Sequence, residues 1–231
     1  MRAHPTRAES TATAPDSWVR WREADLVRAL GRERARARRA AREVLVGLEA
    51  LAGSGRTPVT ALVSEAVPEV LKQYPDAPVQ ASGYLYYYHC HDARETPRGE
   101  HGHFHVFARN ADGSHTHLVG IAVDANGWPM RLFTTNRWVT DERWMPAPDV
   151  LALAERVARS RRPDALARWL LAQLDLFRPQ LETLLRRRDA RLRALRRGRK
   201  QQRLFEDRRV RVLSQCRVSL PHQIAVLERA A

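Results

Sequence analysis

The sequence predicts an α+β fold, in which an antiparallel meander of four or more strands packs against helices from the N- and C-terminal parts of the chain. Apolar residues recur at helical intervals before residue 73 and after residue 149, whereas the section 80–146 contains segments that alternate between apolar and polar residues. Within that section, Asp112-Gly113 and Asn126-Gly127 separate alternating segments, and these dipeptides are the strongest short-range signal for hairpins.

The composition is that of a globular protein with a core. The chain has 231 residues, of which 44% are hydrophobic, and it has six tryptophans. Residues 17–231 fit one domain, whereas residues 1–16 lack an apolar stretch and are expected to form a disordered tail. Two cysteines are too few for a disulfide framework, and no apolar run approaches the roughly 18–20 residues of a membrane span. We expect a cytoplasmic protein without membrane contact, and its oligomeric state is left open.

Helices are predicted on both sides of the meander. The N-terminal helices fall within residues 17–73: Ser17 is a fair N-cap for a helix to about Ala52, and a shorter helix fits Thr60 to Lys72, kinked or divided at Pro68. The C-terminal helical region covers residues 149–231, with the helical period over 150–160, 163–177 and 180 to about 197. Residues 208–220 fit a strand pair or a frayed helix equally well.

Four strands are expected, at Tyr84–His91, His101–Arg109, His115–Asp124 and Trp128–Thr135. If each glycine turn has two residues, the strand register follows from the turn. One face of the sheet then carries only apolar residues from the second strand and almost only apolar residues from the next two: Phe104, Val106, Ala108, Val119, Ile121, Val123, Trp128, Met130 and Leu132. We expect this face to be the core. His115 and His117 fall on it as well, which separates them from the other histidines.

Seven of the nine histidines lie between positions 89 and 117. In the predicted register His101, His103 and His105 point away from the core, opposite a shallow trough left by Gly120 and Ala122. If His91 pairs with His101 in the first strand, then His89 faces His103. Imidazoles from neighbouring strands would therefore converge on one surface.

The first hypothesis for this surface is a site for a divalent transition metal, with zinc or iron favoured by imidazole ligands. The expected ligands are His89, His91, His101 and His103. Metal-dependent chemistry on a small anionic substrate would use Glu100, His103 and His105 as catalytic groups, and Gly120, Arg131 and Phe133 to bind the substrate. A hydrogen-bonded polar face without a ligand is the alternative. Whether the protein is an enzyme stays open, because a storage or structural site fits the same residues.

The charge of the chain suggests a second class of partner. The net charge is +14, and residues 186–211 hold 13 basic and 3 acidic residues, a net charge of +10. Nucleic acid could bind there through phosphates. The candidate contacts are Arg186, Arg187, Arg188, Arg193, Arg196 and Arg197. A solvated helix that packs through Leu192 and Leu195 explains the same pattern.

Two enzyme families share a motif with residues 101–107, His-Gly-His-Phe-His-Val-Phe. The segment resembles the histidine triad of nucleotide phosphoramidases and transferases, which implies that His103 is a nucleophile toward phosphate. The pair His103-Phe104-His105 is also similar to the metal-binding pair of endonucleases in which a tyrosine attacks DNA. Gly102 departs from the triad pattern, and the tyrosines Tyr84 to Tyr88 lie in a predicted strand rather than a helix.

A longer resemblance covers residues 84–146. The segments YYYHCH, GEHGHFHVF, THLVGIAVDANGWP and FTTNRWVT resemble an uncharacterised bacterial family of unknown function. The resemblance covers the meander well and the helices loosely. It implies no activity, so the functional hypotheses rest on the residues.

Overall fold

The fold is built on one six-stranded antiparallel sheet. The computed structural model describes residues 17–64, 68–81, 83–92, 94, 96–196 and 200–230. The strands follow one another in the sheet in the order of the chain: β1 (Gln73–Ala81), β2 (Tyr84–His89), β3 (Gly102–Arg109), β4 (His115–Val123), β5 (Pro129–Thr135) and β6 (Val212–Arg217). The predicted α+β class and the four-stranded meander are confirmed. β1 and β6 extend the sheet at its two edges.

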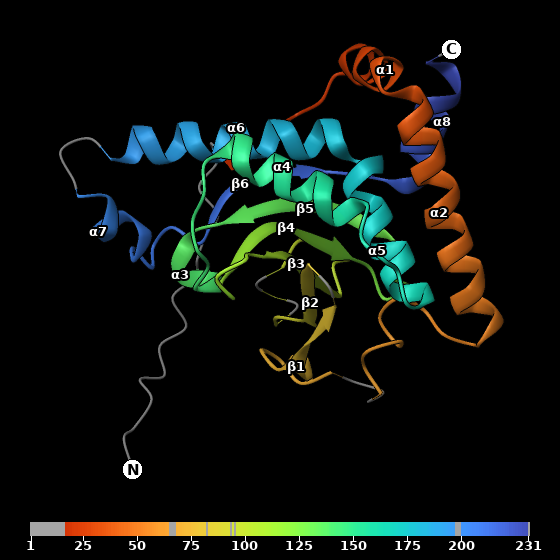
Figure 1. Ribbon diagram of the computed structural model, residues 1–231, viewed down its shortest axis with the longest axis horizontal. Coiled ribbons are helices and arrows are strands. Elements are labelled where there is room, and N and C mark those ends of the chain that lie inside the picture. The colour runs from red at the N-terminus through yellow and green to blue at the C-terminus, as the bar shows by residue number, and fades with distance from the viewer. Residues whose placement is uncertain are drawn as a thin grey trace.

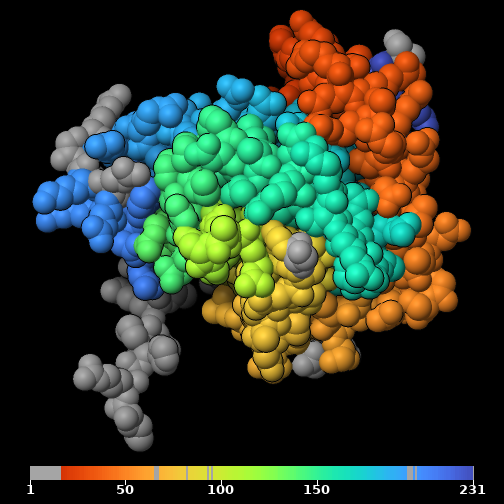
Figure 2. Space-filling view, in the orientation of Figure 1, coloured from red at the N-terminus to blue at the C-terminus, as the bar shows by residue number. Residues whose placement is uncertain are grey.

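The helices gather mainly on one side of this sheet (Figure 1). They are α1 (Glu23–Arg32), α2 (Arg34–Gly53), α3 (Arg137–Thr140), α4 (Ala147–Ala158), α5 (Ala165–Leu176), α6 (Arg178–Leu195), α7 (Gln201–Phe205) and α8 (Leu220–Arg229). α4 packs on β3 and β4, α6 packs on β5 and β6, and α2 packs on α5. In the space-filling view, α4, α5 and α6 form a continuous layer of side chains in front of the sheet (Figure 2).

The helix predicted for Thr60 to Lys72 is wrong. The described residues of that segment form turns and loops, and β1 begins directly after them at Gln73. This strand contains two prolines, Pro75 and Pro78, which are unusual inside a sheet. Prolines are tolerated at the edge of a sheet, where a missing N–H leaves no inner ladder bond unmade, and β1 is an edge strand.

The core lies between the apolar face of the sheet and the helices. Phe104 of β3 is fully buried, and its ring packs edge-on against Trp169 of α5 at a centroid distance of 5.3 Å. α2 approaches α5 very closely at Gly47, where a Cβ atom would lie 2.8 Å from the Cβ of Trp169. Only glycine permits this contact, so α2 is held against the helix layer at that point.

Both glycine turns have three residues between the strands instead of two. The N–H of Asn110 donates to the carbonyl of Ser114, and the N–H of Asp124 donates to that of Trp128. Gly113 and Gly127 adopt φ values of 82° and 85°, the left-handed conformation that ends such a turn. Each hairpin then contains a β-bulge, at Leu118 and near Met130, which restores the predicted register farther from the turn.

The bulges correct the predicted positions of five side chains. Phe107 pairs with His117 and Arg109 with His115, so both histidines lie on the face that carries His105, not on the core face. A two-residue turn would place Leu118 on the face of the histidines. In the structure it is fully buried in the core instead. Trp128 is 41% exposed instead of buried in the core, and Met130 is only half-buried. Pairing errors of one residue exchange the faces because side chains alternate along a strand.

Two further predictions concern segments near the ends of the chain. Residues 208–220, which fit two interpretations, contain strand β6 and the start of α8. The disordered tail predicted for residues 1–16 lies outside the described residues. Among the helices of the described residues, none combines the length and apolar character needed to cross a bilayer.

Candidate metal centre

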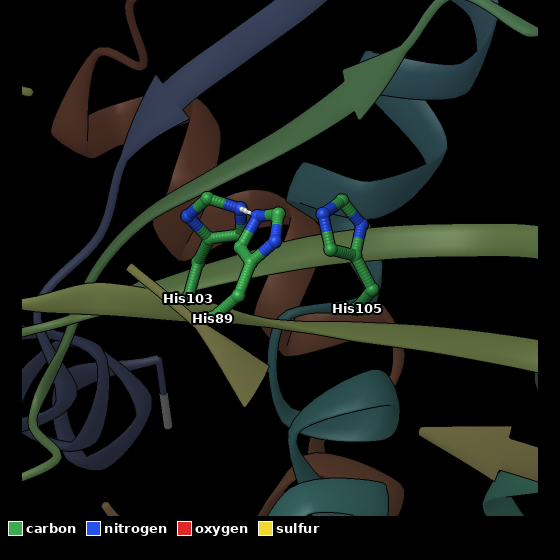
Figure 3. A group of neighbouring side chains, drawn as sticks. All are labelled: His89, His103 and His105. Carbon is green, nitrogen blue, oxygen red and sulfur yellow. Dashed lines mark hydrogen bonds between the residues drawn. The ribbon is translucent and has the colours of Figure 1, made fainter. Parts of the chain in front are cut away.

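Three histidines from two neighbouring strands converge on the face of the sheet opposite the helices. His89 of β2 pairs with His103 of β3, and Tyr87 pairs with His105, as the register predicted. Each of the three histidines offers a ring nitrogen that lies within 4.8 Å of the other two (Figure 3). The Nε2 atoms of His89 and His103 are 2.6 Å apart. These three side chains are called the histidine cluster below.

The cluster is buried and retains unused ring nitrogens. His103 is 4% exposed and His105 is 1% exposed. Nδ1 of His103 and Nε2 of His105 are buried and have no hydrogen-bond partner among the described residues. Buried polar atoms are nearly always paired, so an unpartnered nitrogen on each of two neighbouring histidines requires an explanation.

Burial also keeps these imidazoles neutral. Loss of solvation lowers the pKa of His89 to about 3, and the neighbouring His91 and the positive charge of Arg211 act in the same direction. The pKa values of His103 and His105 lie well below the ordinary value for the same main reason, reinforced by the neighbouring histidines. A neutral imidazole offers a lone pair to a metal ion, whereas a protonated one does not.

The other two predicted ligands, His91 and His101, lie differently. The His91 ring is 4.8 Å from that of His89 and 5.3 Å from that of His103, and its Nε2 contacts the guanidinium of Arg211 at 3.1 Å. It borders the cluster. His101 lies just before β3, and its Nδ1 is hydrogen-bonded to the hydroxyl of Tyr88, a core residue. The structure therefore does not bring His101 to the cluster, and residues 101–105 do not present three alternating histidines on one face.

The bulge at Leu118 places His117 next to the histidine cluster, contrary to the prediction that separated it from the other histidines. Its Nε2 lies 2.9 Å from Nδ1 of His105, and its Nδ1 lies 3.3 Å from the hydroxyl of Thr135. The N–H of His117 donates to Glu142 at 2.7 Å, and burial raises the pKa of this carboxyl to about 7. Sequence reasoning missed Thr135 and Glu142. A three-residue turn at Asp112-Gly113 was the available signal for His117, since it shifts the register by one.

Glu100 and Arg131 bind each other. Nη2 of Arg131 lies 2.8 Å from both carboxylate oxygens of Glu100, and its Nη1 donates to Oε1 of Gln215 at 2.9 Å. Both charged residues are 8% exposed. Burial raises the pKa of Glu100, although Arg131 opposes that shift. Glu100 Oε1 also lies 3.6 Å from Nδ1 of His103. Arg131 was predicted as a substrate clamp, but its guanidinium is already engaged within the protein.

The trough predicted over Gly120 is filled by Phe133. A Cβ atom on Gly120 would lie 2.2 Å from Cζ of Phe133, so the tip of the ring occupies the space over the glycine. The ring also contacts His103, at a centroid distance of 5.0 Å, and the guanidinium of Arg131 at 4.5 Å. Gly120 therefore makes room for Phe133, and Phe133 in turn supports the cluster from one side.

A cavity of about 110 Å³ adjoins the cluster. Loops rather than helices form much of its cover, through Trp18, Thr96, Pro97 and the segment 209–211. The N-terminal segment is held there by Gln215, whose carbonyl accepts the N–H of Val19 at 2.7 Å and whose Nε2 donates to Ser17. Three further arginines besides Arg131 border the cavity: Arg191, Arg209 and Arg211. The surroundings of the cluster thus combine neutral imidazoles with positive charge.

The predicted nucleic-acid segment is partly structural. Arg188 is 1% exposed, contacts Asp189 and lies over the ring of Trp144. Arg186 is exposed and paired with Glu182, and Arg187, Arg193 and Arg196 are exposed as well. Arg197 lies outside the described residues. Among the described residues, nothing beyond this charge supports nucleic acid as a partner.

The chain belongs to the family described as Domain of unknown function (DUF6969), whose sequence model matches residues 38–218. The matched region begins in α2 and includes all six strands, hence the whole histidine cluster. This agrees with the resemblance of residues 84–146 to an uncharacterised family. No curated protein and no solved structure matches the chain. The geometry of the site therefore carries the functional argument.

Proposed function

We propose that the protein binds one divalent transition metal ion, zinc or iron(II), through Nε2 of His89, His103 and His105. The observation that carries this proposal is the convergence of three neutral imidazoles, two of them fully buried and each of those two with an unpartnered ring nitrogen. Side chains that only fill a polar core satisfy their nitrogens with neighbouring groups. A metal ion would satisfy the unpartnered Nε2 of His105 directly.

The hydrogen bonds around the cluster favour Nε2 as the ligand atom. If His105 binds through Nε2, its Nδ1 carries the proton and donates to Nε2 of His117. His117 then carries its own proton on Nδ1, where it faces the hydroxyl of Thr135. His105, His117 and Thr135 then have compatible donor and acceptor roles.

Glu100 lies behind His103 in the same way that His117 lies behind His105. Its carboxylate lies 3.6 Å from Nδ1 of His103, the nitrogen that stays protonated when Nε2 binds a metal. A carboxylate behind a ligating histidine fixes the ring and increases its basicity. We therefore assign Glu100 and His117 to orienting the ligands. Arg131, through its two-point contact, holds Glu100 in place.

Metal binding requires a small movement of the rings. The Nε2 atoms of His89 and His103 are 2.6 Å apart, a hydrogen-bond distance. Two ligands at about 2.0–2.1 Å from a tetrahedral zinc ion are roughly 3.3 Å apart. Small rotations of the two rings, which move each Nε2 atom by a few tenths of an ångström, accommodate this change. His89 is only partly buried and is the ring with the most freedom to move.

Three histidine ligands leave a fourth position open, which is the arrangement of catalytic and not of structural zinc sites. The cavity beside the cluster offers space for a small ligand or several water molecules there. Because arginines border that cavity, a small anion is the favoured ligand. We propose that metal-dependent chemistry, if the protein is an enzyme, acts on such an anion, with His91 and Arg211 at the edge of the site.

The test is the metal content of protein purified without an affinity tag. We expect one equivalent of zinc or iron by elemental analysis, and a matching stoichiometry when the metal-free protein is titrated. His103→Ala should lose this binding. His222→Ala is the matched control, because His222 is exposed and lies in α8, outside the cluster.

Two results would overturn the proposal. The first is a folded wild-type protein that takes up no transition metal from solution. The second is a His103→Ala protein that still binds one equivalent with unchanged affinity. If His103→Ala does not fold, His89→Ala provides the same test at a side chain with less buried surface.

A further inference from the structure

A second and larger cavity shares Trp18 with the cavity beside the histidine cluster, but none of the three histidines lines it. It has a volume of about 1200 Å³ and lies between residues 18–26, the start of β5 and the segment that leads into α8. We call it the tryptophan groove. Its apolar lining includes Trp18, Trp21, Leu26, Trp128, Pro129, Met130, Val218, Leu220 and Pro221.

Aromatic side chains dominate this groove. Three of the six tryptophans of the chain line it, and one of them, Trp128, is 41% exposed. An exposed indole in a groove that two further indoles line offers a surface on which a planar ring can stack. Such a surface is uncommon in a protein that otherwise buries its large aromatic side chains.

Gln180, one of the residues that line the groove, has a buried hydrogen-bond acceptor that is unused and whose orientation is fixed. Nε2 of Gln223 donates to the carbonyl of Leu176, so Oε1 of Gln223 must be an acceptor. Nε2 of Gln180 donates to that Oε1 at 2.7 Å. The chain of amides leaves Oε1 of Gln180 with no partner among the described residues, although the side chain is 3% exposed. A ligand that reaches this oxygen must therefore supply a donor.

An unused donor accompanies it. Nε1 of Trp21 is buried and has no hydrogen-bond partner among the described residues. Indole nitrogen is only a donor, so the complementary ligand atom is an acceptor. The groove thus calls for a planar group that carries both kinds of atom.

The rim of the groove is positively charged. Arg22 is paired with Asp25, and Glu23 is paired with Arg229. Arg20 and Arg217 are exposed, and no carboxylate of the described residues forms an ion pair with either of them. The guanidinium of Arg217 lies over the ring of Trp18 at 5.9 Å. An anionic group is therefore favoured next to the stacking surface.

We propose that the tryptophan groove binds a nucleotide. The base stacks on the indoles, its amino group donates to Gln180, and a ring nitrogen accepts from Trp21. The phosphate lies between Arg20 and Arg217. Planar bases with amino groups and anionic tails match all three features of the groove, whereas an aromatic cation would be repelled by the two arginines. This site is independent of the metal proposal.

The test is titration of the full-length protein with adenosine monophosphate, followed by tryptophan fluorescence and calorimetry. We expect saturable binding of one equivalent. Adenosine, ribose 5-phosphate and an analogue whose purine lacks the amino group should each bind about tenfold more weakly or worse, because they lack the phosphate, the whole base and the hydrogen-bond donor, respectively. Trp128→Ala and Arg217→Ala change exposed side chains, so both should fold and both should weaken binding at least about tenfold.

Arg193→Ala is the matched control, since Arg193 is an exposed arginine on α6 outside the groove, and it should bind like the wild type. Absence of saturable binding overturns the proposal, as does equal binding by wild type and Trp128→Ala. A third contradicting result is binding that appears only after deletion of residues 1–16, because the groove would then belong to that segment in the full chain.

Discussion

The two faces of the central sheet use the same strands for different physical tasks. The face toward the helices is apolar, and Phe104, Val106 and Ile121 are buried there against α4 and α5. The opposite face buries histidines, an arginine–glutamate pair and Phe133, largely under loops. Burial stabilises the first face through the hydrophobic effect. On the second face burial leaves polar atoms that need partners, which is why a ligand there would gain free energy from contacts that the protein lacks.

The largest expected effect is a loss of folding stability in acid, and it comes from the histidines on the polar face. The pKa of His89 falls to about 3 and that of His91 to about 4 in the folded protein, from the ordinary value of 6.5. The unfolded chain thus binds more protons below pH 6.5, and stability falls as the pH drops from 6.5 toward 4. At pH 4, His89 and His91 should each lower the free energy of unfolding by about 3 kcal/mol relative to pH 7. Urea unfolding at pH 7 and pH 4 measures this loss.

Carboxyl groups on the same face act in the opposite direction. Burial raises the pKa of Glu142 to about 7 and also raises that of Glu100. Their stabilising contribution is present at low pH and declines as the pH rises through the folded-state pKa, so they offset part of the histidine effect. His91→Gln should reduce the acid dependence. A free energy of unfolding that stays constant from pH 7 to pH 4 would contradict the assignment of neutral, buried imidazoles.

The next effect concerns the apolar face. Phe104→Ala removes a fully buried ring that packs on Trp169 and Tyr88, and it should lower the free energy of unfolding by about 3–5 kcal/mol. Metal bound per folded molecule should stay unchanged, because the histidine cluster lies on the other face. Phe104→Leu is the control with a smaller loss. If Phe104→Ala also lowered the metal bound per folded molecule, the apolar face and the metal site would not be independent.

A smaller effect is expected at Gly120. An alanine there would bring Cβ to 2.2 Å from Cζ of Phe133 and would displace the ring toward the cluster. Overpacking of this kind costs about 1–3 kcal/mol, and metal affinity should fall with it. Gly53→Ala is the control, because a Cβ atom at Gly53 meets nothing within 4 Å. If Gly120→Ala and Gly53→Ala have the same stability, Phe133 does not depend on the glycine.

The smallest expected effect is on the residue behind His105. His117→Ala removes the acceptor for Nδ1 of His105 and should reduce metal affinity by about 10- to 100-fold without changing the stoichiometry. His117→Gln retains a side-chain acceptor and should recover part of the affinity. Competition with a chelator of known affinity measures both. Unchanged affinity in His117→Ala would mean that this histidine only fills space.

Local pattern was sufficient to predict the meander and the pairing of its first two strands. Alternation in β2 and β3 indicated which residues share a face, and the pairing of His89 with His103 followed from it. The turns were identified at the right glycines but with the wrong length. A two-residue and a three-residue turn both accept Asp-Gly, and the choice depends on how the following strand packs. That choice decided the positions of Leu118, His117 and Trp128.

The sequence by itself determined the fold class, the hairpins and the two strands that carry the cluster, because alternation and glycine turns act over a few residues. Only the tertiary structure decided which histidines meet. His101 was drawn to Tyr88, His117 was turned toward His105 by a bulge, and Arg131 was engaged by Glu100. The reason is physical: each of these contacts joins segments whose approach depends on packing across the whole sheet, and no local pattern records it.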